Sequence, residues 1–233
     1  MEPLTIHRVT ELDLKVAPRP WPFAEARRDE IAAHFAARKR ERPDIWNGRV
    51  LIGSVPDFVG ERFSARYFDV DFASFLAWRD WGFPDRDVFD GFGMGALRAA
   101  DGAFVLGEMG GHTATAGRVY FPSGTPDLDD VRDGRLDIPA SMAREMEEET
   151  GLAPDDYRAA AHWDCIRMGA VIAMIRKLDV DMPGEVLRAK IEANLARQAR
   201  PEFSAIHLVR KRSDLTGAMP RFVTAWLEAQ LPA

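Results

Sequence analysis

The acidic residues between positions 144 and 152 are the part of the chain best suited to chemistry. Glu145, Glu148 and Glu149 are spaced i, i+3 and i+4, which places three carboxylates on one face of a helix, whereas Glu147 points elsewhere. Like charges at this spacing repel one another by about 0.2–0.5 kcal/mol per pair. A divalent cation such as Mg²⁺, which prefers oxygen ligands, would compensate this repulsion. We therefore expect a metal site on this helix, and the alternative is a solvated acidic face.

The sequence around the acids predicts the helix itself. Every residue of 140–150 tolerates a helix, and Gly151 followed by Pro154 is typical of a helix end. Asp137 is suited to cap the first turn, with Pro139 tolerated just after it, and we favour this role over that of a metal ligand.

The same helix should have an apolar side that docks on a core. Met142 and Met146 are four residues apart on a stripe different from that of the acids, and Leu152 follows the helix end. The helix is therefore expected to hold its carboxylates at the border between core and solvent.

The order of residues 144–152, Arg-Glu-Met-Glu-Glu-Glu-Thr-Gly-Leu, fits the pattern R-E-U-x-E-E-x-G-U, with U a bulky apolar residue. This string resembles the second half of the Nudix box of the Nudix hydrolase superfamily. The first half, G-x5-E-x7, departs from the family, because its Gly position falls on Asp130 and its Glu position on Leu136. The turn at 122–126 resembles the family's Gly-rich turn, which implies an insertion at 127–135. The departure puts in doubt the number of metal ions and the turn geometry.

The resemblance implies an α/β/α sandwich with a mixed β-sheet. It also implies a hydrolase of phosphorus anhydrides that uses Mg²⁺ or Mn²⁺ and metal-activated water to cleave the diphosphate of a nucleoside diphosphate linked to another group, as in a nucleotide sugar or ADP-ribose. By the same resemblance, Glu145, Glu148 and Glu149 would hold the metal, and Arg144 would orient Glu148 through an ion pair.

Three residues outside the helix are further candidates for the site. Glu202 precedes a late strand, where many Nudix enzymes carry a general base or an extra metal ligand, although a solvated loop acid is the alternative. Gly124 lies in the turn before the helix and His112 in the Gly-rich loop 110–117, and we expect both near the substrate. Tyr120 and Trp163 could stack on a base, but aromatic residues in strands are more often core residues.

Two other functions are kept as alternatives. Residues 112–124 loosely resemble the segment that precedes the box in coenzyme A diphosphatases. A non-catalytic sensor of a nucleotide or of ADP-ribose would explain the broken first half of the motif, although retention of all the helix carboxylates argues against it.

Composition limits the remaining classes. The chain has 233 residues, 46% of them hydrophobic, and a net charge of −6, which argues against a broad nucleic-acid surface. No apolar stretch has the length of a signal peptide or a membrane span, and the single cysteine, Cys165, suits a reducing compartment and a core position. The five histidines lack zinc-site spacing. We expect a cytoplasmic protein with a small nucleotide-type partner, and a homodimer is left open.

Glycine, proline and aspartate gather between residues 82 and 93, which predicts a boundary between an N-terminal extension, 1–92, and a Nudix-like domain, 93–233. In the second part, Asp101-Gly102 predicts a hairpin between strands at 94–100 and 103–109. A proline-rich arm is expected at 17–22. Further helices are expected at 23–40, 71–81, 185–197 and after Pro220, and further strands at 49–53, 61–70, 118–121, 158–167, 170–177 and 205–209.

Overall fold

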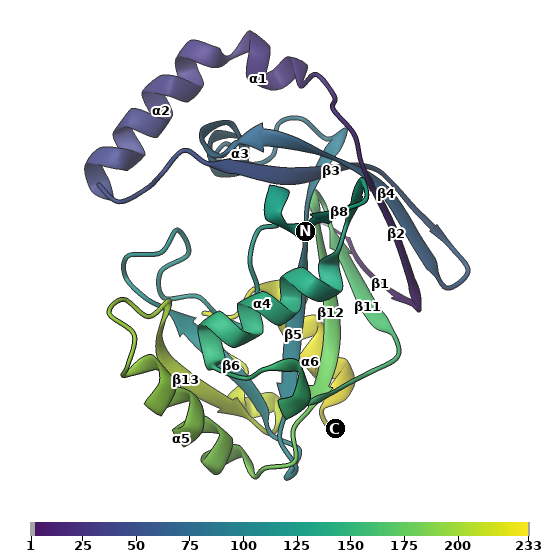
Figure 1. Ribbon diagram of the computed structural model, residues 1–233, viewed down its shortest axis with the longest axis vertical. Coiled ribbons are helices and arrows are strands. Elements are labelled where there is room, and N and C mark those ends of the chain that lie inside the picture. The colour runs from purple at the N-terminus through teal and green to yellow at the C-terminus, as the bar shows by residue number, and fades with distance from the viewer. Residues whose placement is uncertain (1–2, 233) are drawn as a thin grey trace.

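The computed structural model describes residues 3–232, and a mixed β-sheet forms its centre (Figure 1). Most neighbouring strands are antiparallel, but β5 and β12 are parallel, as are β2 and β4. The main strand order is β1 (Leu4–Val9), β11 (Trp163–Met168), β12 (Val171–Asp179), β5 (Val88–Arg98), β3 (Arg49–Val59), β4 (Arg62–Asp71), β2 (Glu11–Val16), β9 (Arg135–Leu136) and β8 (Val131–Arg132). Beside this path, β6 (Phe104–Met109) pairs with β5, β7 (Val119–Tyr120) and β13 (Phe203–Val209), and β10 (Arg158–Ala159) pairs with β12.

Helices cover both faces of the sheet, as predicted for a sandwich. α4 (Ile138–Thr150) and α5 (Gly184–Leu195) share one apolar core with β5, β6 and β12, whereas α6 (Arg221–Gln230) shares another core with the opposite face of the same strands. Figure 1 shows α4 in front of β5 and α6 behind it. The predicted α/β/α sandwich with a mixed sheet is confirmed.

β5 is the strand that positions α4, and it begins six residues before the predicted start at 94. Gly93, at the end of the predicted boundary region, and Gly95, in the predicted strand, let α4 approach the sheet. A Cβ added at Gly93 would lie 2.8 Å from Cγ2 of Ile138, and one at Gly95 would lie 2.6 Å from the Met146 sulfur. Glycine in a strand interior commonly marks such a close approach.

The N-terminal part adds strands to the same sheet. β1 pairs with β11, and β3 pairs with β5 at Gly53–Phe89 and Ser54–Val88. The predicted border at 92/93 falls inside β5, and the division into 1–92 and 93–233 stays a prediction. β1 and β2 were not predicted, because charged residues interrupt their apolar pattern.

Two helices occupy the region predicted as one helix at 23–40. α1 (Pro22–Ala26) and α2 (Arg28–Glu41) are separated at Arg27, whose guanidinium lies 4.1 Å from the ring centroid of Trp81. Pro22 is the first residue of α1, although the proline-rich arm was expected to exclude helix as far as this residue. Proline is tolerated there because the first helical N–H has no partner within the helix.

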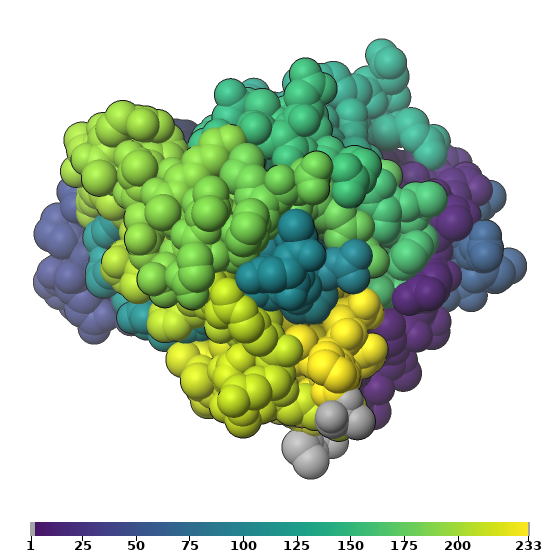
Figure 2. Space-filling model, turned by 90° about the horizontal axis from the view of Figure 1, so that it is seen from below, coloured from purple at the N-terminus to yellow at the C-terminus, as the bar shows by residue number. Residues whose placement is uncertain are grey.

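Most of the other predicted elements are present with small changes at their ends, but β3 continues six residues beyond its predicted end at 53, and the strand predicted at 158–167 is divided into β10 and β11. Asp71 caps α3 (Phe72–Asp80) by accepting a hydrogen bond from the Ser74 N–H, and the hairpin turn after β5 has Gly102 at φ 84°. In Figure 2 the hairpin tip, in dark teal, lies among the yellow-green and yellow segments of the C-terminal part. Within residues 3–232, no helix is long and apolar enough to cross a membrane.

Candidate active site

α4 has the local structure that its sequence predicts. Asp137 accepts a hydrogen bond from the Ala140 N–H at 3.0 Å, so its carboxylate caps the helix, and Gly151 ends the helix at φ 74°. Met142, Met146 and Leu152 are buried in the core that α4 shares with the sheet. These contacts fix the rotation of the helix and therefore the directions of its carboxylates.

The acidic side chains of α4 differ in solvent exposure. Glu149 is 2% exposed, the Glu145 side chain is 12% exposed, and the Glu148 side chain is 59% exposed. Glu147 is exposed. The predicted metal ligands therefore occupy unequal environments, because Glu149 is buried, Glu145 is partly buried and Glu148 lies at the rim.

The innermost carboxylate is only partly satisfied. Oε2 of Glu149 accepts a hydrogen bond from the Ser123 backbone N–H at 3.0 Å, whereas its buried Oε1 has no hydrogen-bond partner among residues 3–232. A buried carboxylate oxygen without a partner is costly. The oxygen is therefore available to a ligand that carries positive charge or donates a hydrogen bond.

Burial and mutual repulsion raise the pKa values of both inner acids. Burial raises the pKa of Glu145 to about 7, although the Arg144 charge lowers it, and the carboxylates of Glu148 and Glu202 raise it further. Burial, followed by the charges of Glu145 and Glu202, raises the pKa of Glu149 well above its usual range. These shifts show that the charged forms of both carboxylates are disfavoured here in the absence of a compensating positive charge.

Arg144 contacts two acids more closely than the one predicted. Its guanidinium lies 2.8 Å from Glu145 and 3.1 Å from Asp130, but 3.7 Å from Glu148. Its geometry therefore favours orientation of Glu145, and the role toward Glu148 stays a prediction.

Asp130 is a residue of this site that sequence reasoning missed. It is buried and accepts hydrogen bonds from the Ser141 hydroxyl at 2.9 Å and from Arg144. The sequence comparison marked it only as a mismatch at the motif's Gly position. The turn η1 (Leu128–Asp130), inside the predicted insertion, brings it to α4, and no local spacing announces that contact.

The turn before the insertion lies against Glu145. A Cβ added at Gly124 would lie 2.2 Å from Glu145 Oε1, so a larger residue here would displace the Glu145 carboxylate. The turn is held on both sides, because the Pro122 carbonyl accepts from the Gly95 N–H at 3.1 Å and the Pro126 carbonyl accepts from the Leu51 N–H at 2.7 Å. Gly124 therefore lies at the carboxylates, and its contact with substrate stays a prediction.

Glu202 and His112 come from two loops that meet. The Glu202 carbonyl accepts a hydrogen bond from the Gly110 N–H at 2.7 Å, and the His112 ring lies beside Gly110. The Glu202 side chain is exposed, yet its charge reaches Glu145 and Glu149. The predicted roles, general base for Glu202 and substrate contact for His112, stay predictions.

A cavity of about 640 Å³ begins at the same turn. It includes Ser123 and Gly124 and continues over the face of β5 opposite α4, toward α6. Its other lining residues are Arg79, Phe83, Asp90, Phe92, Met94, Thr115, Arg118, Tyr120, Thr125, Met168, Val171, Thr216, Gly217, Met219, Pro220, Arg221, Phe222 and Thr224. The carboxylates of α4 and this cavity are thus joined by one turn of the chain.

Tyr120 links the cavity to the carboxylates electrostatically. Burial raises the pKa of its phenol, which shares a hydrogen bond with the Thr115 hydroxyl, and the nearby charges of Glu149 and Glu202 raise the pKa further. Tyr120 was expected as a core residue, but it is only partly buried and lines the cavity.

Trp163 and Cys165 are core residues, as expected. Both are buried in the core that contains α4. Burial raises the pKa of the Cys165 thiol to about 12, which disfavours the thiolate that a nucleophile requires.

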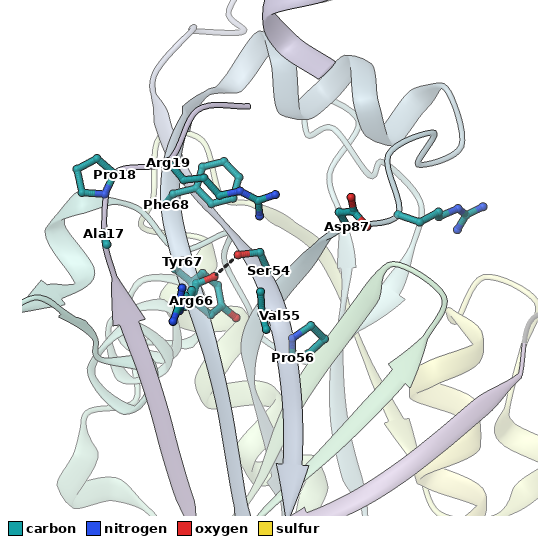
Figure 3. Close-up of a pocket in the computed structure, with 11 residues that line it drawn as sticks. Ala17, Pro18, Arg19, Ser54, Val55, Pro56, Arg66, Tyr67, Phe68 and Asp87 are labelled. Carbon is teal, nitrogen blue, oxygen red and sulfur yellow. Dashed lines mark hydrogen bonds between the residues drawn. The ribbon is translucent and has the colours of Figure 1, made fainter. Parts of the chain in front are cut away.

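A second cavity, of about 500 Å³, lies between the proline-rich arm and the strands β3 and β4 (Figure 3). Arg19, Arg66 and Ser54 are among the residues around it, and Val55 lies at its edge with φ 51°. Among the residues that the structure describes, no residue of the turn at 122–126 lines this cavity, whereas the first cavity includes Ser123 and Gly124, which contact Glu149 and Glu145. We therefore place the candidate site at the first cavity.

The donor set of α4 suits a hard divalent cation. Within residues 3–232, no group of three or more His, Cys, Asp or Glu side chains is arranged as a metal centre. Mg²⁺, however, keeps several waters and commonly takes only one or two carboxylates together with substrate phosphates. The unpartnered oxygen of Glu149 beside the partly buried carboxylate of Glu145 fits that requirement.

Comparisons with known proteins found similarity to solved structures. No protein-family model and no curated protein sequence matches the chain. Similar solved structures include a Nudix hydrolase from M. Smegmatis, RenU, with a TM-score of 0.38, 12% identity, and coverage of 61% of this chain and 86% of that chain. Another is the MutT protein from Methanosarcina mazei Go1, with a TM-score of 0.38, 17% identity, and coverage of 61% and 92%.

A third similar structure is a bifunctional NMN adenylyltransferase/ADP ribose pyrophosphatase from Francisella tularensis. Its TM-score is 0.34 at 11% identity, and the match covers 57% of this chain and 37% of that chain. At these identities, the activity of this chain has to be argued from its own residues.

Proposed function

We propose that this protein is a metal-dependent pyrophosphohydrolase of the Nudix type that cleaves the diphosphate of a nucleoside diphosphate linked to another group. One observation carries the proposal: the unpartnered buried oxygen of Glu149 lies in a cluster of negative charge with Glu145, where a cavity large enough for a nucleoside begins. A small ligand pocket typically has a volume of about 300–1,000 Å³.

The chain's own residues would prepare such a site. Glu145 and Glu149, with Glu148 at the rim, would hold Mg²⁺ or Mn²⁺, and the Ser123 N–H and Arg144 would keep the two inner carboxylates in place. The bound cation would polarise a phosphoryl oxygen and lower the pKa of a bound water. Glu202, whose charge already reaches the inner acids, would accept a proton from the attacking water.

Basic residues of the cavity suit the anionic part of the substrate. Arg79, Arg118 and Arg221 line the cavity that begins at Ser123 and Gly124. Guanidinium groups bind phosphate oxygens well because their N–H groups match the oxygens in geometry and charge. The diphosphate would therefore lie near the turn, with the nucleoside deeper in the cavity.

The experiment that tests the function is a substrate screen with and without metal. Nucleotide sugars, ADP-ribose, dinucleotides, nucleoside triphosphates and coenzyme A are offered with Mg²⁺ or Mn²⁺, and released phosphate-containing products are measured. We expect turnover of a nucleoside diphosphate-linked compound only with metal, at least a hundredfold loss in Glu149→Gln, and little change in Glu147→Gln, which is exposed on the same helix. Tight binding of a nucleotide without turnover of any compound would instead support the sensor, and turnover of coenzyme A alone would support the coenzyme A diphosphatase.

The cytoplasmic location and the homodimer stay predictions. Neither is needed for the proposed chemistry, because every residue invoked for it belongs to one chain.

A further inference from the structure

Asp90 is a buried acid that lines the cavity, and the proposed hydrolysis assigns it no role. It is the third residue of β5, and its side chain lies on the face opposite α4, as the alternation of the strand requires, because Phe92 and Met94 on the same face line the same cavity. Asp90 is 9% exposed, and its Oδ1 has no hydrogen-bond partner among the residues described. A carboxylate can only accept hydrogen bonds, so this oxygen lacks a donor.

Arg79, the charged neighbour of Asp90, does not supply the missing hydrogen bond. Arg79, which also lines the cavity, lowers the pKa of Asp90, but burial has the larger effect and the pKa is raised to about 6. The Arg79 Nε lies 3.8 Å from Asp80, and its guanidinium lies 5.7 Å from the ring centroid of Phe75. Asp90 Oδ1 therefore remains open to a hydrogen-bond donor from the cavity.

The walls beside Asp90 suit a flat ring. Phe92 and Phe222 lie edge to face, with centroids 6.0 Å apart at 69°. Met94 and Met219 extend this apolar surface. Aromatic and thioether side chains pack well on the face of a heterocycle, while the carboxylate meets its edge.

We propose that Asp90 accepts hydrogen bonds from the base of the substrate and that this base is guanine, so that the protein acts on guanosine diphosphate-linked compounds. The proposal rests on the proposed function for the orientation of the nucleotide. Guanine presents two adjacent donors, N1–H and the 2-amino group, to one acceptor-only carboxylate. Adenine and cytosine present one amino group, and uracil presents one N–H.

Equilibrium binding tests this assignment without requiring turnover. Isothermal titration calorimetry of the full chain measures Kd for GDP, IDP, ADP, UDP and CDP, each with Mg²⁺. We expect GDP to bind at least tenfold more tightly than each of the others. IDP is the sharpest comparison, because it lacks only the 2-amino group and needs no change in the protein.

The variant Asp90→Asn replaces one carboxylate oxygen, which accepts hydrogen bonds, with an amide nitrogen, which donates them. We expect about ten- to hundredfold weaker GDP binding, as for loss of a hydrogen bond to a charged group. Xanthosine diphosphate should then bind more tightly to Asp90→Asn than to the natural chain, because its C2 carbonyl can accept from the new amide. Asp87→Asn, the same change at an exposed position three residues earlier, should leave every Kd unchanged.

Equal binding of GDP and IDP to the natural chain, or unchanged GDP binding in Asp90→Asn, would overturn the assignment. A melting curve shows whether Asp90→Asn is folded, and if it is not, the comparison of GDP with IDP decides alone. Guanine-selective binding without hydrolysis would remove the proposed enzymatic function and leave the assignment of Asp90 standing. Hydrolysis at the same rate with every base would support the proposed enzymatic function and overturn the assignment of Asp90.

Discussion

Replacement of Glu145 by glutamine should stabilise the metal-free protein, although it damages the proposed metal site. The folded-state pKa of Glu145 is raised to about 7 from the ordinary value of 4.5. A group whose pKa rises on folding favours the folded state below the unfolded pKa, and this advantage is lost as the pH rises through the folded pKa. The stabilisation that the protonated Glu145 side chain gives to the folded state is therefore lost above about pH 7.

The magnitude follows from the same two values. At about 1.4 kcal/mol for each pH unit, the difference between about 7 and 4.5 corresponds to about 3 kcal/mol at pH 8. At pH 5 the same group costs about 1 kcal/mol or less, because most of the carboxylate is protonated in the folded state. The Glu145 side chain is only 12% exposed, so little of this cost is screened by solvent.

The assay is urea unfolding in the presence of a chelator at pH 5 and pH 8. Glu145→Gln should raise the free energy of unfolding by up to about 3 kcal/mol at pH 8 and by much less at pH 5. Glu147→Gln, on the exposed side of the same helix, should change neither value. Added Mg²⁺ should raise the free energy of unfolding of the natural chain by more than it raises that of the Glu145→Gln variant, since a ligand stabilises only the state that binds it.

The reasoning would be refuted if Glu145→Gln lowered stability at pH 8 in the presence of the chelator. That result would mean that the ion pair with Arg144 outweighs the burial of the charge. The carboxylate would then be a structural partner of the arginine, and the case for an excess of negative charge awaiting a cation would be lost.

Three further variants test the geometry. Gly124→Ala should lower kcat at least tenfold because its methyl group collides with the nearest helix carboxylate, whereas Gly111→Ala, with open space around it, should keep full activity in the same assay. Glu202→Gln should lower kcat by about 10²–10⁴ with little change in KM if it is the general base, and steady-state kinetics would show no change for a solvated loop acid. Val55→Gly should raise the free energy of unfolding by about 0.5–1 kcal/mol by relieving its left-handed backbone, whereas Val59→Gly, equally exposed without that strain, should lower it in the same denaturation experiment.

α4 could be predicted almost completely from the sequence because its signals are local. The cap at Asp137, the apolar pair Met142 and Met146, and the stop at Gly151 all lie within a few residues of the atoms they satisfy. A local signal needs no knowledge of the rest of the chain.

The partners of the helix could not be predicted in the same way, because they depend on chain paths between distant segments. Asp130 reaches Arg144 only because a short turn folds back on the helix, and the cavity collects residues from 79 to 224. The role of Gly93 and Gly95 in β5 could not be predicted for the same reason. In the sequence, Gly93 ends a run rich in proline and aspartate that indicates a boundary, and only the presence of α4 shows why side chains are excluded at Gly93 and Gly95.

β5 therefore connects the two halves of the proposed site. On one face, Gly93 and Gly95 let α4 approach until its acidic side reaches the turn at Gly124. On the other face, the even-numbered residues Asp90, Phe92 and Met94 line the cavity. Because alternate residues of one strand belong to opposite faces, a shift of β5 by one residue would exchange these surfaces and place a carboxylate and a phenyl ring against α4. The register that seats the helix is thus the same register that directs Asp90 into the cavity, which couples the proposed catalytic carboxylates to the proposed recognition of the base.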